Sequence, residues 1–187
     1  QLAAFTTVQI PALTTAQVVA LTSDQAGSMK TAQLAVLTTA QLVAIQIEDL
    51  VTLSTAQLRG LTTAQVAALT IAQLSAMGTD QVAGLSTLQV AALTTAQTAA
   101  LTTKQAAALT TAQVANMTVD QIAAMEATDV AAMTTAQVVA LGTAQVAALT
   151  TAQLAGMSTL QISKMEVADF AAITVDQLPK MTTEQIA

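Results

Sequence analysis

Large apolar residues recur every eight residues along this 187-residue chain. In the octad LTTAQVVA (residues 13–20), we number Leu13 as position 1. Position 1 is always large and apolar, position 6 is mostly Val, Ile or Leu, and position 8 is mostly Ala or Gly. Position 5 is Gln in most octads, whereas position 4 accepts small, apolar and charged residues. We therefore expect positions 1, 5, 6 and 8 to face inward and position 4 to face solvent.

A single frame holds throughout, without insertion or deletion. The segment Phe5–Lys180 comprises 22 full octads, with partial octads at residues 1–4 and 181–187. We therefore interpret residues 1–187 as a single continuous octapeptide-repeat array. Neither end carries a polar capping repeat, so we expect a longer array or ends that other subunits cover. No signal peptide is visible at Gln1, which is expected of a processed chain or of a fragment.

The octad length excludes one continuous helix. Eight residues at about 100° each overshoot two full turns by about 80°, so the apolar stripe would wind around the helix. The helix must therefore break once per octad.

Thr at position 2 and Gln at position 5 supply that break, because together they form a capping box. The apolar residues at positions 1 and 6 flank the box as a hydrophobic staple. The pattern predicts an all-α solenoid, with a helix of one to two turns over positions 3–8 and a corner at positions 1 and 2. Representative cap pairs are Thr14 with Gln17, Thr62 with Gln65, Thr110 with Gln113, and Thr150 with Gln153.

The alternative fold is a β-solenoid, since Thr and Val favour strands. Ala and Gln disfavour strands, and the Gly, Asn and Asp of tight β-corners are scarce. Apolar residues five apart would also lie on opposite faces of a strand. Pro11 and Pro179 at position 7 fit the helix only partly. How many octads form one coil stays open at this point.

Three octads replace the position-5 Gln by Asp and place a long polar residue at position 2. The joint change suggests that positions 2 and 5 touch, as in a rewired cap. A calcium or acid–base site is the alternative, but calcium needs six to eight oxygens and paired acids need a pocket. We favour the rewired cap. The pairs are Gln46 with Asp49, Glu126 with Asp129, and Glu166 with Asp169.

The composition excludes several classes of function. Charged residues make up 9% of the chain against about 25% in average domains. His, Cys, Tyr and Trp are absent, so we expect no catalysis, no bound metal and no cofactor. The net charge of −6 argues against nucleic-acid binding, and no apolar run is long enough for a transmembrane helix.

Threonine recurs at positions 2 and 3 and is the main exposed feature that we expect. Regular threonine arrays resemble the faces of ice-binding solenoids. The alternative, which we favour, is that position 2 caps helices and position 3 is half-buried, since Ile47, Ile71, Val119, Val167 and Val175 occur there. The position-5 Gln row predicts buried amides that hydrogen-bond to a neighbour or to the backbone.

The string LTTAQVAA resembles octapeptide arrays of large bacterial surface and adhesin-like proteins, over the whole chain. That resemblance implies an exported bacterial protein that serves at the cell surface as a stalk, adhesin or fibre. Residues 13–20 are also similar to the opening helix of TAL-effector repeats, but the long repeat and the base-reading pair of those proteins are missing. We expect a self-assembling extracellular fibre or adhesin stalk whose partners are copies of itself, and no small-molecule ligand. The alternative is a soluble ice-binding solenoid.

Overall fold

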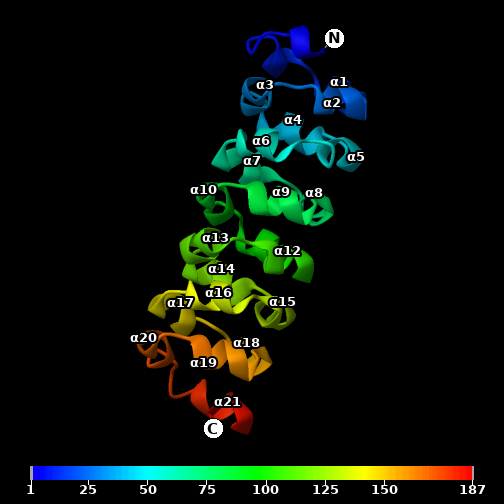
Figure 1. Ribbon diagram of the computed structural model, residues 1–187. Helices are drawn as coiled ribbons and strands as arrows, with labels where there is room; N and C mark the ends of the chain where they lie inside the picture. The colour runs from blue at the N-terminus through cyan, green and yellow to red at the C-terminus, as the bar shows by residue number, and fades with distance from the viewer. Residues whose placement is uncertain (1, 187) are drawn as a thin grey trace. The chain divides into compact units, whose positions relative to one another are not determined.

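The computed structural model describes residues 2–186 and consists of short helices joined by tight corners (Figure 1). No strand occurs in residues 2–186, so the chain is all-α and the β-solenoid alternative is wrong. Helix α7 (Thr63–Ala68) shows the typical octad: it covers positions 3–8, and Leu61 and Thr62 form the corner before it. The predicted capping and stapling residues therefore lie at the helix starts.

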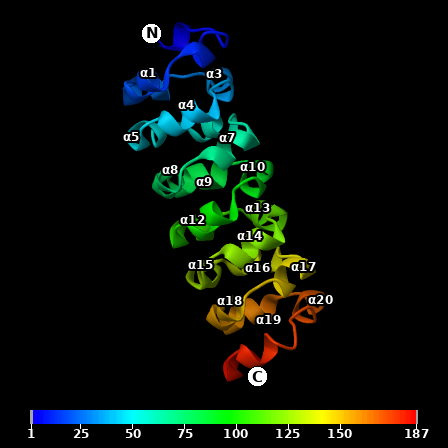
Figure 2. The same ribbon diagram turned by 180° about the vertical axis from the view of Figure 1, so that it is seen from behind.

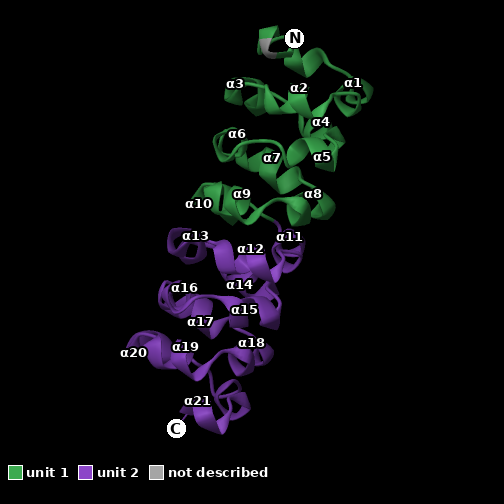
Figure 3. Ribbon diagram, turned by 45° about the vertical axis from the view of Figure 1, so that its right-hand side comes forward, with its two compact units in different colours: residues 1–93 green, residues 94–187 purple. Residues whose placement is uncertain are grey.

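The chain divides into two compact units, residues 1–93 and 94–187, coloured separately in Figure 3. The helices of unit 1 are η1 (Leu2–Ala4), η2 (Ile10–Ala12), α1 (Thr15–Val19), α2 (Ser23–Gly27), α3 (Thr31–Ala35), α4 (Thr39–Ala44), α5 (Ile47–Leu50), α6 (Thr55–Arg59), α7 (Thr63–Ala68), α8 (Ile71–Ala76), α9 (Thr79–Gly84) and α10 (Thr87–Ala91).

The helices of unit 2 are α11 (Thr95–Ala99), α12 (Thr103–Ala108), α13 (Thr111–Asn116), α14 (Val119–Ala124), α15 (Ala127–Ala132), α16 (Thr135–Val139), α17 (Thr143–Ala147), α18 (Thr151–Gly156), α19 (Thr159–Lys164), α20 (Val167–Phe170), η3 (Leu178–Lys180) and α21 (Thr183–Ile186).

Within each unit, α-helices pack against the helix three places along the chain. In unit 1, α1 contacts α4, α4 contacts α7 and α7 contacts α10; in unit 2, α12 contacts α15 and α15 contacts α18. One coil of the solenoid therefore holds three octads. The front and back views show the successive coils within each unit (Figures 1 and 2).

Positions 1 and 6 form the thin apolar core between coils. Leu42, Leu58 and Leu154 at position 6 are fully buried, and Leu61 at position 1 is 4% exposed. Aliphatic side chains of this size fill a narrow layer that an aromatic ring would overfill. This arrangement explains why the chain needs almost no aromatic residues.

Positions 3 and 8 lie at the edge of the core. Position 8 is half-buried in many octads, which is less than we expected for an inward position. At position 3, Ile47, Ile71 and Val119 are 39%, 49% and 41% exposed, and Val167 and Val175 are 88% and 85% exposed. The prediction that position 3 is half-buried is therefore wrong at all five residues.

The two prolines change the local helix type. Pro11 lies in η2 and Pro179 lies in η3, both short 3₁₀ helices in place of the usual α-helix. Proline removes the amide that would donate four residues back, and its ring crowds that carbonyl. The octad keeps its length but shortens its helix.

None of the helices described between residues 2 and 186 is long and apolar enough to cross a bilayer.

Candidate functional site

The position-5 glutamine caps its own helix. The Oε1 atom of Gln65 accepts from the backbone amide of Thr62 at 2.7 Å, and Thr62 Oγ1 accepts from the amide of Gln65 at 3.2 Å. Two amides without an intrahelical partner are thereby satisfied at the start of α7. The same two bonds join Thr14 with Gln17, Thr110 with Gln113, and Thr150 with Gln153.

The other end of the same amide reaches the preceding coil. Gln65 Nε2 donates to the carbonyl oxygens of Leu34 at 2.8 Å and Leu37 at 2.7 Å, at the corner between α3 and α4. The side chain is 2% exposed, so its donor and acceptor are both used in the interior. One residue therefore joins a helix start to a corner of the coil before it.

This bond pattern recurs in both units. At Gln153 the amide nitrogen donates to carbonyls 31 and 28 residues earlier, those of Ile122 at 2.8 Å and Met125 at 2.7 Å, whereas Gln81 uses carbonyls 30 and 28 residues earlier. We call these residues the glutamine row. Members that bond to carbonyls 31 and 28 residues earlier include Gln33, Gln41, Gln65, Gln73, Gln89, Gln137, Gln145, Gln153, Gln161 and Gln185.

The representative pairs differ in burial. Gln17 forms the cap with Thr14 but is exposed to solvent. Gln113 forms the cap with Thr110 and is 1% exposed. The local cap therefore forms with or without burial, whereas the bonds between coils depend on packing.

The three variant octads differ from the predicted rewired cap. Gln46, Glu126 and Glu166 each precede a helix, but none forms a side-chain cap hydrogen bond. The physical reason is length: the short side chains of Ser, Thr, Asn and Asp suit the N-cap, whereas the polar group of Gln or Glu lies farther from the backbone. Positions 2 and 5 therefore change together for another reason.

In the octad at residues 45–52, both changed positions contact the preceding coil. Gln46 Nε2 donates to the Val19 carbonyl at 2.9 Å, so the long side chain reaches the earlier coil from position 2 instead of position 5. Asp49 Oδ1 accepts from the Ser23 hydroxyl at 2.7 Å, while Asp49 Oδ2 is buried without a partner. The variant octad therefore keeps a connection between coils but leaves one carboxylate oxygen unsatisfied.

Burial in the variant octads changes the pKa of the aspartates, as Asp129 shows. Burial raises the pKa of this carboxyl, the Thr103 hydroxyl lowers it in part, and the nearby Glu126 raises it further. Asp129 is 1% exposed and its Oδ2 atom has no hydrogen-bond partner. Burial and Glu166 likewise raise the pKa of Asp169. No three acidic side chains in residues 2–186 gather as metal ligands would.

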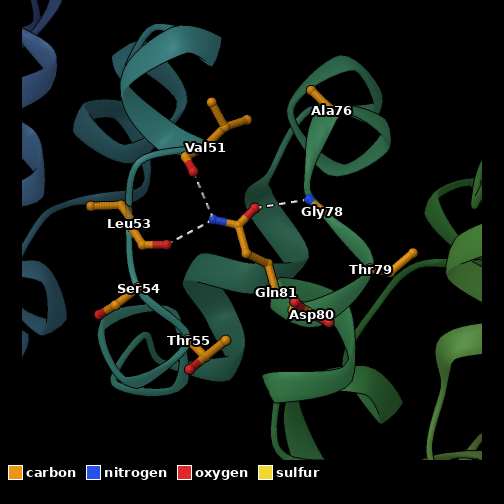
Figure 4. A pocket seen from close by; sticks show the side chains of 9 residues that line it. All are labelled: Val51, Leu53, Ser54, Thr55, Ala76, Gly78, Thr79, Asp80 and Gln81. Carbon is orange, nitrogen blue, oxygen red and sulfur yellow. Dashed lines mark hydrogen bonds between the residues drawn. The ribbon is translucent and has the colours of Figure 1, made fainter.

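A surface hollow of about 540 Å³ lies beside Gln81 in unit 1 (Figure 4). Gly78 at position 2 has no side chain to cover the glutamine, which is 9% exposed. Gln81 still accepts from the Gly78 amide at 2.9 Å and donates to the carbonyls of Val51 at 3.2 Å and Leu53 at 2.7 Å. Asp80 is the one ionisable residue among those that line this hollow.

Sequence reasoning missed the contact between position 8 and position 3 of the preceding coil. A Cβ atom on Gly84 would lie 2.8 Å from Thr55 Cβ, and one on Gly60 would overlap Thr31 Cγ2. The 24-residue spacing of Gly60 and Gly84 was the available signal, since it equals one coil. The same coil length would have placed Ser23 and Thr103 beside the buried aspartates.

Capped single-turn helices, three per coil, and a glutamine row between coils define a helical octapeptide solenoid. The ALTTAQ repeat family matches residues 1–31, 42–79, 72–103 and 122–159, which together exceed half of the chain. The chain belongs to the ALTTAQ repeat family. The comparison with curated proteins found no match.

Proposed function

We propose that this protein is a structural, self-assembling repeat element of an extracellular fibre or surface-adhesin stalk, and that it carries out no catalysis. The observation that carries the proposal is the glutamine row, in which the amide of Gln65 spans two coils through both of its ends. The repeated polar group of the octad thus serves cohesion of the solenoid. A chain whose repeated polar side chain holds stacked coils together suits a load-bearing or spacing role.

The inventory of side chains supports the absence of catalysis. The chain has no His or Cys, and Asp80 is the one ionisable residue among those that line the hollow beside Gln81. General acid–base or nucleophilic chemistry needs at least a paired set of such groups. We place the protein at the bacterial cell surface or outside the cell on the strength of its resemblance to surface octapeptide arrays.

Negative-stain electron microscopy of the purified chain tests the proposal. Uniform filaments that lengthen with concentration are the expected result. Monodisperse single particles at every soluble concentration would contradict self-assembly.

Ice binding is the second candidate, and exposed threonines at position 3 favour it. Thr15, Thr39 and Thr63 are exposed in successive coils of unit 1. Thermal hysteresis of the single particles, absent from a variant with these threonines changed to Lys, would select this candidate.

A further inference from the structure

Three octads per coil sort the side chains onto three faces, and one face differs from the other two. We call it the A face and define it as positions 2–4 of every third octad. Helices α1, α4, α7 and α10 carry it in unit 1, and α13, α16, α19 and α21 carry it in unit 2. Within each unit these helices contact one another in sequence. The octads of the A face begin at Leu13, Leu37, Leu61, Leu85, Leu109, Met133, Met157 and Met181.

Within each unit, the A face bears a double row of hydroxyl groups. Position 2 is Thr or Ser and position 3 is Thr in every A-face octad. Octads in which position 2 or 3 is not Thr or Ser all belong to the other faces. Examples of such residues are Gln46, Gly78 and Ile71. The position-2 hydroxyls serve the caps, whereas position-3 hydroxyls such as those of Thr63 and Thr111 belong to exposed residues.

Charge is sorted in the same way. Of all the ionisable side chains in the chain, only Lys164 and Glu184 belong to A-face octads. The other faces place acids and bases at the exposed position 4, including Asp80, Lys104 and Asp120. The net charge of −6 therefore lies almost entirely away from the A face.

Exposed leucines replace charge on the A face. Leu88 is 71% exposed and Leu160 is 56% exposed, and both occupy position 4 within the string STLQ. One lies in each unit. Depletion of charged residues is typical of the core of a protein–protein interface, so this uncharged surface suits contact with another protein.

We propose that the A face of each unit binds the A face of a second copy of the chain. A hydroxyl both donates and accepts, so a hydroxyl row can pair with an identical row. A second copy matches the repeat spacing by construction, because both surfaces are built from the same coil. The double row carries no charge that would lose its hydration when two copies bind. On the other faces, the acidic side chains of one copy would repel the same acidic side chains of the second copy.

This inference rests on the proposed self-assembly and names the surface that mediates it. The contact is isologous, since the same patch contributes from both copies. An isologous contact closes at two chains, so lateral pairing and filament growth are separate measurements.

The test places charge on the A face and on a matched position elsewhere. Ala40→Glu with Ala136→Glu changes position 4 on α4 and α16, and Ala72→Glu with Ala144→Glu changes position 4 on α8 and α17. All four alanines are exposed, and position 4 already holds acids such as Asp120, so both variants should fold. Circular dichroism checks that they do.

Sedimentation velocity over a concentration series measures pairing. We expect the wild type and the α8/α17 variant to form dimers with the same Kd, and the A-face variant to bind with a Kd raised about tenfold or more. Leu88→Ser with Leu160→Ser should weaken pairing in the same direction. Equal Kd values for the two glutamate variants, or a wild type that stays monomeric, would overturn the inference.

Electron microscopy of the same samples separates the two proposals. Filaments that persist in the A-face variant while its pairing is unchanged would overturn this inference and leave the proposed fibre intact. Dimers that the A-face glutamates abolish, without filaments in any sample, would support the A-face contact and contradict the fibre.

Discussion

The side-chain nitrogen of Gln65 donates a 2.7 Å hydrogen bond to the backbone carbonyl of Leu37, 28 residues earlier. This bond joins two coils, and its donor belongs to the amide that also caps α7. A side chain in this place must accept at one end and donate at the other. Glutamine has both groups at the required length, whereas glutamate lacks the donor and asparagine lacks the reach.

Gln65→Glu should therefore lower the free energy of unfolding by about 2 to 4 kcal/mol, because a buried carboxylate would face two carbonyl oxygens. Urea denaturation followed by circular dichroism measures the change. Gln17→Glu is the matched control, since Gln17 forms the same cap but is exposed. We expect a change below about 0.5 kcal/mol there. Equal losses of unfolding free energy in the two variants would show that the glutamine stabilises the fold through the helix cap alone, without the bonds between coils.

Restoring the common octad at residues 125–132 should stabilise unit 2. Glu126→Thr with Asp129→Gln replaces a buried, partly unsatisfied carboxylate with a capping pair. We expect the double variant to gain about 1 to 2 kcal/mol at pH 7. A double-mutant cycle from denaturation curves measures the coupling of the two positions. An identical effect of Glu126→Thr with Asp or Gln at 129 would rule out coupling.

Acidification should stabilise the protein through Asp129. Its pKa is raised in the folded protein above its ordinary value of 3.8, so the folded state binds the proton more tightly than the unfolded chain. The stabilisation is complete below about pH 3.8 and is lost as the pH rises through the folded pKa. The pKa of Asp169 is also raised, so this carboxyl likewise stabilises the folded protein at low pH.

Asp129→Asn removes that titration, so the variant should gain less stability than the wild type when the pH falls from neutral to about 4. Urea denaturation at a series of pH values provides the comparison. Asp120→Asn, at an exposed position 4, serves as the control for the loss of one negative charge. A pH profile of the Asp129→Asn variant that matches the wild type would contradict the assignment.

Gly84→Ala should destabilise unit 1 by about 1 to 2 kcal/mol, because overpacking forces the backbone to shift. The new Cβ atom would lie 2.8 Å from Thr55 Cβ, an atom that no rotation of the threonine side chain can move away. Gly78→Ala is the control, since its Cβ meets only Gln81 Oε1, at 3.8 Å. Thermal unfolding of both variants should show a lower Tm for Gly84→Ala alone.

Local features of the chain were readable from the sequence. The eight-residue frame, the break once per octad and the pairing of Thr62 with Gln65 all depend on contacts within about one helical turn. Chain geometry and hydrogen-bonding capacity determine such contacts, so the repeating letters suffice to predict them. The all-α class follows from them directly.

Only the tertiary structure decided that three octads form a coil. Coil size depends on how the corner angles add up and how position 6 packs against the neighbouring coil, which no single octad specifies. That size places Gln65 against Leu37 and the Ser23 hydroxyl against Asp49. The same size gathers the hydroxyl rows on one face and the charges on the others, because residues 24 apart in the sequence become neighbours in space.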